Sequence, residues 1–139
     1  MTTTSSSTRI ETLISDAKGV ADSLAVLFRA RPDVLNHNVE TVPRLQRAMR
    51  PSAGYARSLG VLAAAKTAGL VTKSSLMVGV GESDDELIGA LADLAGVGCD
   101  IVTIGQYLRP TTHHLPVARW VEPAEFDRWQ QVGEALGIG

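Results

Sequence analysis

The chain has 139 residues, of which 45% are hydrophobic and 20% charged, and its formal net charge is -2. These values indicate one soluble globular domain, too short for a complete β/α barrel of about 250 residues. The 13 Lys and Arg residues are scattered along the chain, which argues against nucleic acid as a partner, and no apolar run approaches the roughly 20 residues that a membrane span requires.

The N-terminal residues 1–8 are rich in Ser and Thr. They lack both the apolar core of a secretory signal and the repeated arginines of a transit peptide. We expect a disordered tail on a cytoplasmic protein, followed by one domain over residues 9–139. Cys99 is the single cysteine, which excludes an internal disulfide and any metal site built only from cysteines of one chain.

The first predicted strand-helix unit follows the tail. Residues 9–14 alternate polar and apolar side chains over their first half, which predicts a strand with one exposed face. From Val20 the apolar residues take helical spacing until Arg31 and Pro32, where proline is expected to end the helix.

A second strand is predicted over residues 34–40, although Asn36, His37 and Asn38 interrupt it. Asparagine is depleted in strands, so sheet propensity does not explain these residues. Alternate side chains of an extended chain share a face, so we expect Asn36, Asn38 and Glu40 to point together and a structural His37 to point away. Two amides and a carboxylate on one side suit an amino acid head group or a ribose. The alternative is a polar strand end that bonds its own helix turn.

The remainder of the chain continues the alternation of strand and helix. A helix is predicted to open near residue 41, and another over residues 55–68 with Gly69 as its left-handed cap. A strand over 72–79 is followed by a helix after Ser83, whose apolar stripe runs from Leu87 through Ile88 to Ala95. The last predicted elements are a strand over 101–106 and a helix whose apolar face is spaced by Phe126, Trp129, Gly133 and Leu136. Ser83 and Glu86 match a capping box. This order is typical of an α/β fold with about four parallel β/α units, in which ligands meet the carboxyl ends of the strands.

Three further motifs give weak signals. The turn from Gly79 to Glu82 lacks the third glycine of a dinucleotide fingerprint and the lysine of a phosphate loop, although its glycines permit close approach of a ligand and Glu82 can accept hydrogen bonds. Arg50 and Lys73 are isolated cations, which are usually solvated charges. The adjacent pair at residues 113–114 lacks the i, i+4 spacing of two metal-binding histidines, so no metal site is predicted there.

Four blocks of sequence, in consecutive order, resemble the signature blocks of the lipoyl synthase family. They are residues 31–45 (RPDVLNHNVETVPRL), 71–82 (VTKSSLMVGVGE), 98–110 (GCDIVTIGQYLRP) and 114–117 (HLPV). The resemblance covers residue 9 to about residue 137. It implies a radical S-adenosylmethionine enzyme with a partial (β/α)6 barrel, to which this chain would contribute the later strands.

The resemblance also implies an activity and a set of site residues. Enzymes of this family insert two sulfurs, at C6 and C8, into an octanoyl chain carried on a lysine of a lipoyl-carrier protein or domain. One [4Fe-4S] cluster cleaves S-adenosylmethionine to a deoxyadenosyl radical, and a second [4Fe-4S] cluster gives up its sulfurs. The residues that match the S-adenosylmethionine side of the family barrel are Asn36, Asn38, Glu40, Arg50, Lys73, Glu82, Gln106 and Tyr107.

The sequence departs from the family at the cluster ligands. The family uses two cysteine triplets and a serine motif near its C-terminus, none of which occurs here, and Cys99 matches a position that is not a ligand. We expect a fragment or shortened gene product that binds no cluster and makes no lipoyl groups alone. The alternative is a non-catalytic half-barrel that binds S-adenosylmethionine or a partner chain, such as a cysteine-bearing N-terminal half. A purely structural role is the third interpretation and the least supported.

Overall fold

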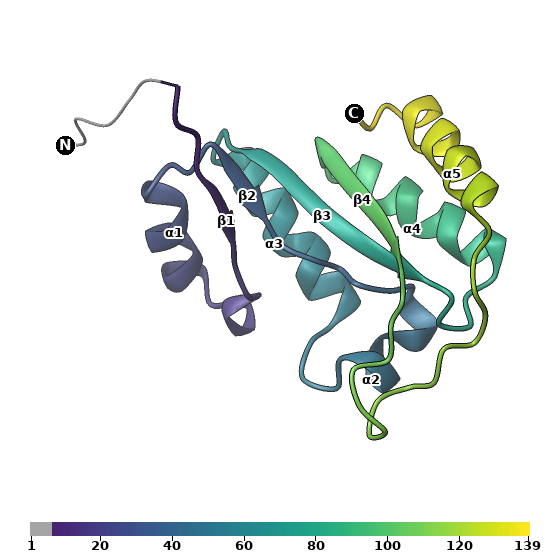
Figure 1. The fold of residues 1–139 in the computed structure, drawn as a ribbon. Helices are drawn as coiled ribbons and strands as arrows, with labels where there is room; N and C mark the ends of the chain where they lie inside the picture. The colour runs from purple at the N-terminus through teal and green to yellow at the C-terminus, as the bar shows by residue number, and fades with distance from the viewer. Residues whose placement is uncertain (1–6) are drawn as a thin grey trace.

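The computed structural model describes residues 7–139, so most of the predicted tail lies outside the described residues. The elements, drawn in Figure 1, are β1 (Glu11–Leu13), η1 (Ala17–Gly19), α1 (Ala21–Arg29), β2 (Val34–Asn36), η2 (Pro43–Leu45), α2 (Gln46–Met49), α3 (Tyr55–Thr67), β3 (Val71–Val78), α4 (Asp84–Gly96), β4 (Ile101–Gln106) and α5 (Pro123–Ala135).

The four strands form one sheet in the order β1-β2-β3-β4, and every neighbouring pair is parallel. The predicted α/β fold with four parallel units is therefore confirmed. The helices α1, α3, α4 and α5 pack on one face of the sheet, and the opposite face is uncovered (Figure 1). This arrangement is that of an open, partial β/α barrel, whose uncovered face corresponds to the barrel interior.

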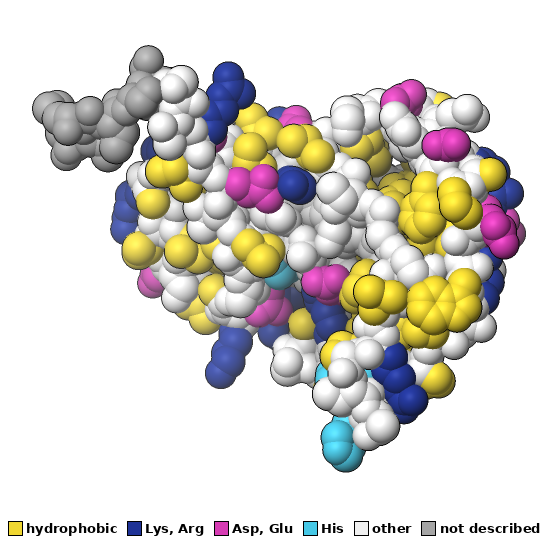
Figure 2. All heavy atoms as spheres, viewed as in Figure 1, with side chains coloured by type: hydrophobic (Ala, Val, Ile, Leu, Met, Phe, Trp, Pro, Cys, Tyr) yellow, Lys and Arg dark blue, Asp and Glu magenta, His cyan; other side chains and the backbone are white. Residues whose placement is uncertain are grey.

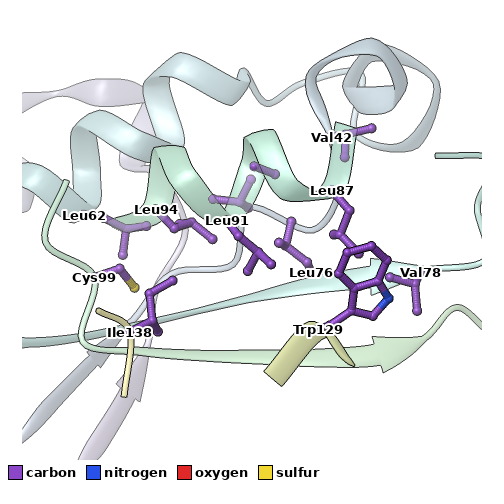
Figure 3. Close-up of a cluster of buried hydrophobic side chains, with 12 residues drawn as sticks. Val42, Leu62, Leu76, Val78, Leu87, Leu91, Leu94, Cys99, Trp129 and Ile138 are labelled. Atoms are coloured by element: carbon purple, nitrogen blue, oxygen red, sulfur yellow. The ribbon is translucent and has the colours of Figure 1, made fainter. Parts of the chain in front are cut away.

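The core lies between the sheet and the helices. On β3 every second residue is buried, so Leu76 and Val78 point toward the helices and meet Leu87, Leu91 and Trp129 (Figure 3). A smaller cluster packs β2 against α1 and α3; its buried members are Leu24, Phe28, Leu35, Val61, Ala65 and Leu70. Each large apolar side chain buried in this way contributes roughly 1.5–3 kcal/mol.

The predicted helix signals are confirmed except at Ile88 and at Leu136, which follows α5 and is 39% exposed. The Ser83 hydroxyl accepts the Glu86 N–H at 3.1 Å, and the Glu86 carboxylate accepts the Ser83 N–H at 2.9 Å. Gly69 has a φ of +86° and ends α3 as predicted. The prediction that Ile88 belongs to the buried stripe of α4 is wrong, because it lies about 100° around the helix from Leu87 and is 40% exposed.

Regular pairing of β2 ends at Asn36, four residues earlier than predicted. The N–H of Val39 donates to the side-chain hydroxyl of Ser74 at 3.1 Å and not to a carbonyl of β3, so the ladder is interrupted. Pairing returns at one isolated bridge between Glu40 and Leu76. The chain nevertheless stays extended enough to carry its side chains to the carboxyl end of the sheet.

Within residues 7–139, none of the helices combines the length and the apolar character needed to cross a membrane.

Candidate functional site

The carboxyl ends of the parallel strands meet at one edge of the sheet, in the lower part of Figure 1. A first pocket of about 610 Å³ lies between the ends of β1 and β2 and the loop after α2. A second pocket of about 580 Å³ lies between the end of β2, Met77 of β3 and the segment after β4. Glu40, Met49, Arg50 and Pro51 line both pockets, so the two form one continuous region.

Figure 2 shows the uncovered face from the same side. Hydrophobic side chains lie mainly along its two margins, and its middle consists mostly of backbone and uncharged polar atoms. Acidic, basic and histidine side chains gather lower on this face, where the strands end. The polar chemistry of the uncovered face is thus concentrated at the mouth of the partial barrel.

The predicted alternation at the end of β2 is confirmed. Asn36, Asn38 and Glu40 are half-buried on the uncovered side, whereas His37 is 4% exposed and points into the protein. Glu40 has a φ of +74°, in the left-handed region that non-glycine residues rarely adopt, and strain of this kind often occurs at functional sites. Two backbone hydrogen bonds to β3 hold it there, to Ser75 at 3.0 Å and from Met77 at 2.8 Å. Its carboxylate makes no hydrogen bond within residues 7–139.

Arg50 follows α2 and reaches back over the end of β2. One terminal nitrogen donates to the Asn38 carbonyl, and the other donates to the Ser58 hydroxyl at 2.8 Å. Burial lowers the pKa of Arg50, and the charges of Glu40 and Asp16 oppose that shift. The Arg50 Nε and the Asn38 side-chain oxygen are buried and have no partner in the described part of the chain. We call Asn38, Glu40 and Arg50 the Arg50 site.

Asn36 and Lys73, two of the predicted site residues, lie together on the uncovered face, nearer the amino end of β3 than the Arg50 site is. Both donate to the same carboxylate, that of Glu11 on β1, at 3.0 Å from Asn36 and 3.1 Å from Lys73. The hydrogen bond from Lys73, followed by that from Asn36, lowers the pKa of Glu11. Lys73 is therefore an ion-paired residue of the sheet surface and not the isolated solvated cation that its sequence context indicates.

Glu82 and Gln106 lie together in a second place, which we call the Gly79 turn: residues 79–82 with Gln106 and Arg119. Both Glu82 oxygens accept backbone N–H groups of the turn, at 3.2 and 2.9 Å. The Gln106 amide donates to the Arg119 carbonyl at 3.2 Å and accepts the Val121 N–H at 2.9 Å. These side chains satisfy backbone groups, and they line neither pocket.

Tyr107 forms a wall of the second pocket and is 4% exposed. Its hydroxyl donates to the Leu115 carbonyl at 2.7 Å, which ties the segment after β4 over the pocket. His113 and His114 line the same pocket, with the His114 ring bonded to Thr111 at 2.8 Å. Among residues 7–139 no group of three or more His, Cys, Asp or Glu side chains is arranged to hold a metal ion.

Three residues of this region escaped sequence reasoning. Asp16 closes the end of β1 and lines the first pocket, and its position at a strand end was the available signal. Glu11 meets Lys73, 62 positions away, only through the order of the strands. Ser58 lies inside α3 without any local motif, and only the packing of α3 on β2 brings it to Arg50.

Comparisons with known proteins point to one family. The sequence profile of the Radical SAM superfamily matches residues 1–105. The chain is similar to the lipoyl synthase of Mycobacterium avium (strain 104), with 57% identity over 95% of this chain and 43% of that protein. It is 56% identical to the lipoyl synthase of Mycobacterium tuberculosis (strain ATCC 25618 / H37Rv), again over 95% of this chain and over 42% of that protein. The chain thus spans less than half the length of the curated relatives it matches.

Proposed function

The chain belongs to the radical SAM superfamily, and from this premise we propose that it supplies the S-adenosylmethionine-facing wall of a lipoyl synthase barrel. The relatives it resembles at 56–57% identity are named lipoyl synthases. Their activity, the insertion of two sulfurs into a protein-bound octanoyl chain, and their partner, an octanoylated lipoyl-carrier protein or domain, belong to this proposal.

One observation carries the proposal: the Arg50 site holds opposite polar groups that lack partners. Arg50 presents a cation with a buried N–H donor, and Asn38 and Glu40 present oxygen acceptors. The amino acid end of S-adenosylmethionine is a zwitterion that needs both kinds of group. A guanidinium is suited to a carboxylate, and an amide oxygen and a carboxylate are suited to an ammonium group or ribose hydroxyls. When bound, S-adenosylmethionine supplies the adenosyl group from which this family generates its radical.

The other predicted residues have supporting parts in this proposal. Tyr107 forms a wall of the pocket, and Lys73 and Asn36 join β1, β2 and β3 through Glu11 on the adjoining part of the uncovered face. Glu82 and Gln106 shape the Gly79 turn. We propose direct contact with S-adenosylmethionine for Asn38, Glu40, Arg50 and Tyr107, and a supporting place for the rest.

The iron-sulfur clusters of the family do not fit this chain. A cluster needs several cysteine thiolates, and the only cysteine, Cys99, is 4% exposed with its sulfur 3.3 Å from the Ile101 carbonyl. Burial raises the pKa of this thiol, which disfavours the thiolate that a metal requires. Cys99 also lies before β4, at the end of the sheet opposite to the Arg50 site. The proposal therefore assigns cluster ligation to other polypeptide.

Calorimetric titration of the 139-residue chain tests the proposal. We expect S-adenosylmethionine to bind at least tenfold more tightly than 5′-methylthioadenosine, which lacks the amino acid end, because the Arg50 site is built for that end. Decarboxylated S-adenosylmethionine should bind with intermediate affinity, since only the contact with the guanidinium is lost. Equal affinity for all three ligands contradicts the proposal, and so does the absence of binding by any of them.

A second candidate function is supported by the edge of the sheet. The outer edge of β1 pairs with no described strand, and Ile10 and Leu13 on it are 59% and 63% exposed. Open edges of this kind accept strands from other chains. Under this alternative the chain is a non-catalytic half-barrel that docks onto a cysteine-bearing partner. Co-expression with the N-terminal part of the Mycobacterium avium relative should yield a stable, iron-containing complex. Recovery of two separate chains contradicts the alternative.

A further inference from the structure

Beneath the Arg50 site a chain of three hydrogen bonds runs from β1 to Arg50. We infer that His37 and Ser58 are positioning residues, which hold the Arg50 guanidinium in one orientation through these hydrogen bonds. We call the three bonds the relay; its polarity, meaning which atom donates and which accepts in each bond, has only one allowed form. The inference rests on the proposed function only in that Arg50 is the group meeting the ligand. Neither residue was assigned a functional part by the sequence, since His37 was predicted to be structural and Ser58 was not singled out.

The two inner residues of the relay are buried, and the residues at its ends, Ile14 and Arg50, are half-buried. His37 is 4% exposed and Ser58 is fully buried at 0%. The His37 Nδ1 lies 3.0 Å from the Ile14 carbonyl, and its Nε2 lies 2.9 Å from the Ser58 hydroxyl. The Ser58 hydroxyl in turn lies 2.8 Å from a terminal nitrogen of Arg50. The relay therefore joins the end of β1, the end of β2, α3 and the loop after α2.

The chemistry of the two ends decides where each proton lies. The Ile14 carbonyl can only accept, so Nδ1 of His37 must carry a hydrogen. The guanidinium can only donate, so the Ser58 oxygen accepts from Arg50. Burial lowers the pKa of His37, and the nearby Arg50 charge acts in the same direction, so the ring is neutral at pH 7 and its Nε2 is an acceptor. Ser58 must then donate its only proton to Nε2.

This polarity leaves Arg50 with a defined orientation. One terminal nitrogen is held by Ser58 and the other by the Asn38 carbonyl, so the plane of the guanidinium is fixed at two points. The buried Nε, which has no partner in the described chain, is left for the ligand. A long side chain that is oriented before binding loses less conformational freedom when the ligand arrives.

The tautomer of His37 is the first test. Long-range ¹H–¹⁵N correlation spectra of the full chain at pH 7 should show His37 as the Nδ1–H tautomer, with Nε2 unprotonated. Replacing His113 and His114 in turn assigns the signals. An Nε2–H tautomer or an imidazolium overturns the inference, because Ser58 could then not donate toward the ring.

Variants of Ser58 are the second test. Ser58→Ala should broaden or shift the Arg50 Nε–H resonance, alter the ¹⁵N shifts of His37 and weaken S-adenosylmethionine binding about tenfold. Ser58→Thr, which keeps the hydroxyl, should restore part of the affinity. Thr72→Val is the matched control: it also removes a fully buried hydroxyl, but at the opposite end of β3, where Thr72 meets Asp100. It should lower stability without changing affinity.

Failure of the proposed function and failure of the positioning relay give different results. If the wild-type chain binds no S-adenosylmethionine, the proposed function falls, while the spectra of His37 and Arg50 still decide the positioning relay. If the wild-type chain and Ser58→Ala bind S-adenosylmethionine equally tightly and the Arg50 resonance is unchanged, only the positioning relay is contradicted and the proposed function stands. If Ser58→Ala does not fold, Arg50→Met removes the donor at the other end of the relay, and unchanged ¹⁵N shifts of His37 in that variant contradict the inference.

Discussion

The Arg50 site and the Gly79 turn both lie at strand ends and both were predicted to face the cofactor, yet their polar groups differ. In the Gly79 turn, the oxygens of Glu82 and the amide of Gln106 are all used by backbone groups. In the Arg50 site, a donor of Arg50 and an acceptor of Asn38 are buried without partners.

This difference separates two uses of polar residues at a sheet edge. A buried polar group that is fully hydrogen-bonded stabilises the fold, because leaving it unsatisfied costs about 1–3 kcal/mol. A group left unsatisfied by the protein is stabilised when a ligand supplies the missing partner. Position at a strand end is therefore not sufficient evidence of a binding role, and the Arg50 site differs from the Gly79 turn in combining pocket-lining residues with buried polar atoms that lack partners.

The largest expected effect comes from Gly79→Ala. Gly79 has a φ of +88°, and an added Cβ would lie 2.5 Å from the Arg119 carbonyl and 2.5 Å from the Gln106 amide nitrogen. We expect the free energy of unfolding to fall by about 3 kcal/mol from the backbone conformation and the close contact together. Urea denaturation followed by circular dichroism measures it.

Gly69→Ala is the matched control for this change. Its φ of +86° is nearly the same, but an added Cβ would meet only the Arg31 side chain at 3.6 Å. It should cost about 1–2 kcal/mol, the backbone contribution alone. Equal losses for both variants would show that Gly79 tolerates a side chain and that the Gly79 turn is not closely packed.

Arg50→Met is expected to have the largest effect on ligand affinity. Loss of a charged hydrogen bond should weaken S-adenosylmethionine binding by about 2 kcal/mol, roughly 30-fold, in calorimetric titration. It should also remove the preference for S-adenosylmethionine over its decarboxylated analogue. Arg47→Met, on the exposed side of α2, is the control and should bind as the wild type does. An unchanged preference in Arg50→Met would move the carboxylate contact elsewhere.

Glu82→Gln should have the opposite effects to Arg50→Met: it should lower stability and leave ligand affinity nearly unchanged. Its carboxylate accepts two N–H groups of the Gly79 turn, and the amide can accept only with one oxygen. We expect a loss of about 1 kcal/mol in the free energy of unfolding, with an affinity for S-adenosylmethionine within twofold of wild type. A large loss of affinity with unchanged stability would show that Glu82 meets the ligand, as the sequence predicted, and would remove the distinction between the two regions.

The smallest expected effect is a pH dependence of the free energy of unfolding that arises from His37. Its pKa is lowered below the ordinary value of 6.5, mainly by burial, so the unfolded chain binds a proton at a higher pH than the folded chain does. The contribution of neutral His37 to the free energy of unfolding is therefore fully present above pH 6.5. It is lost as the pH falls toward the folded pKa, with a slope below about 1.4 kcal/mol per pH unit. Denaturation midpoints at pH 7.0 and 5.5 measure it. His37→Gln should reduce this slope, and an unchanged slope would show that His37 is not its source.

The sequence by itself determined the order and type of the elements. Apolar spacing located α4 through Leu87, Leu91 and Leu94, and the capping box located its start, because both signals lie within a few residues of one another. The alternation around His37 likewise separated the buried from the uncovered side chains of β2, since that period is a property of the extended backbone. The match to family signature blocks predicted which residues face the cofactor.

Only the tertiary structure decided which of those residues share a pocket and which are already satisfied. Lys73 finds Glu11, Gln106 finds Arg119 and Arg50 finds Ser58 through contacts between separate elements. Such contacts depend on how helices and strands pack, and no periodicity or local motif encodes them. The hydrogen-bond state of a buried group is a property of all its neighbours at once, which is why the distinction between the Arg50 site and the Gly79 turn emerges only after folding.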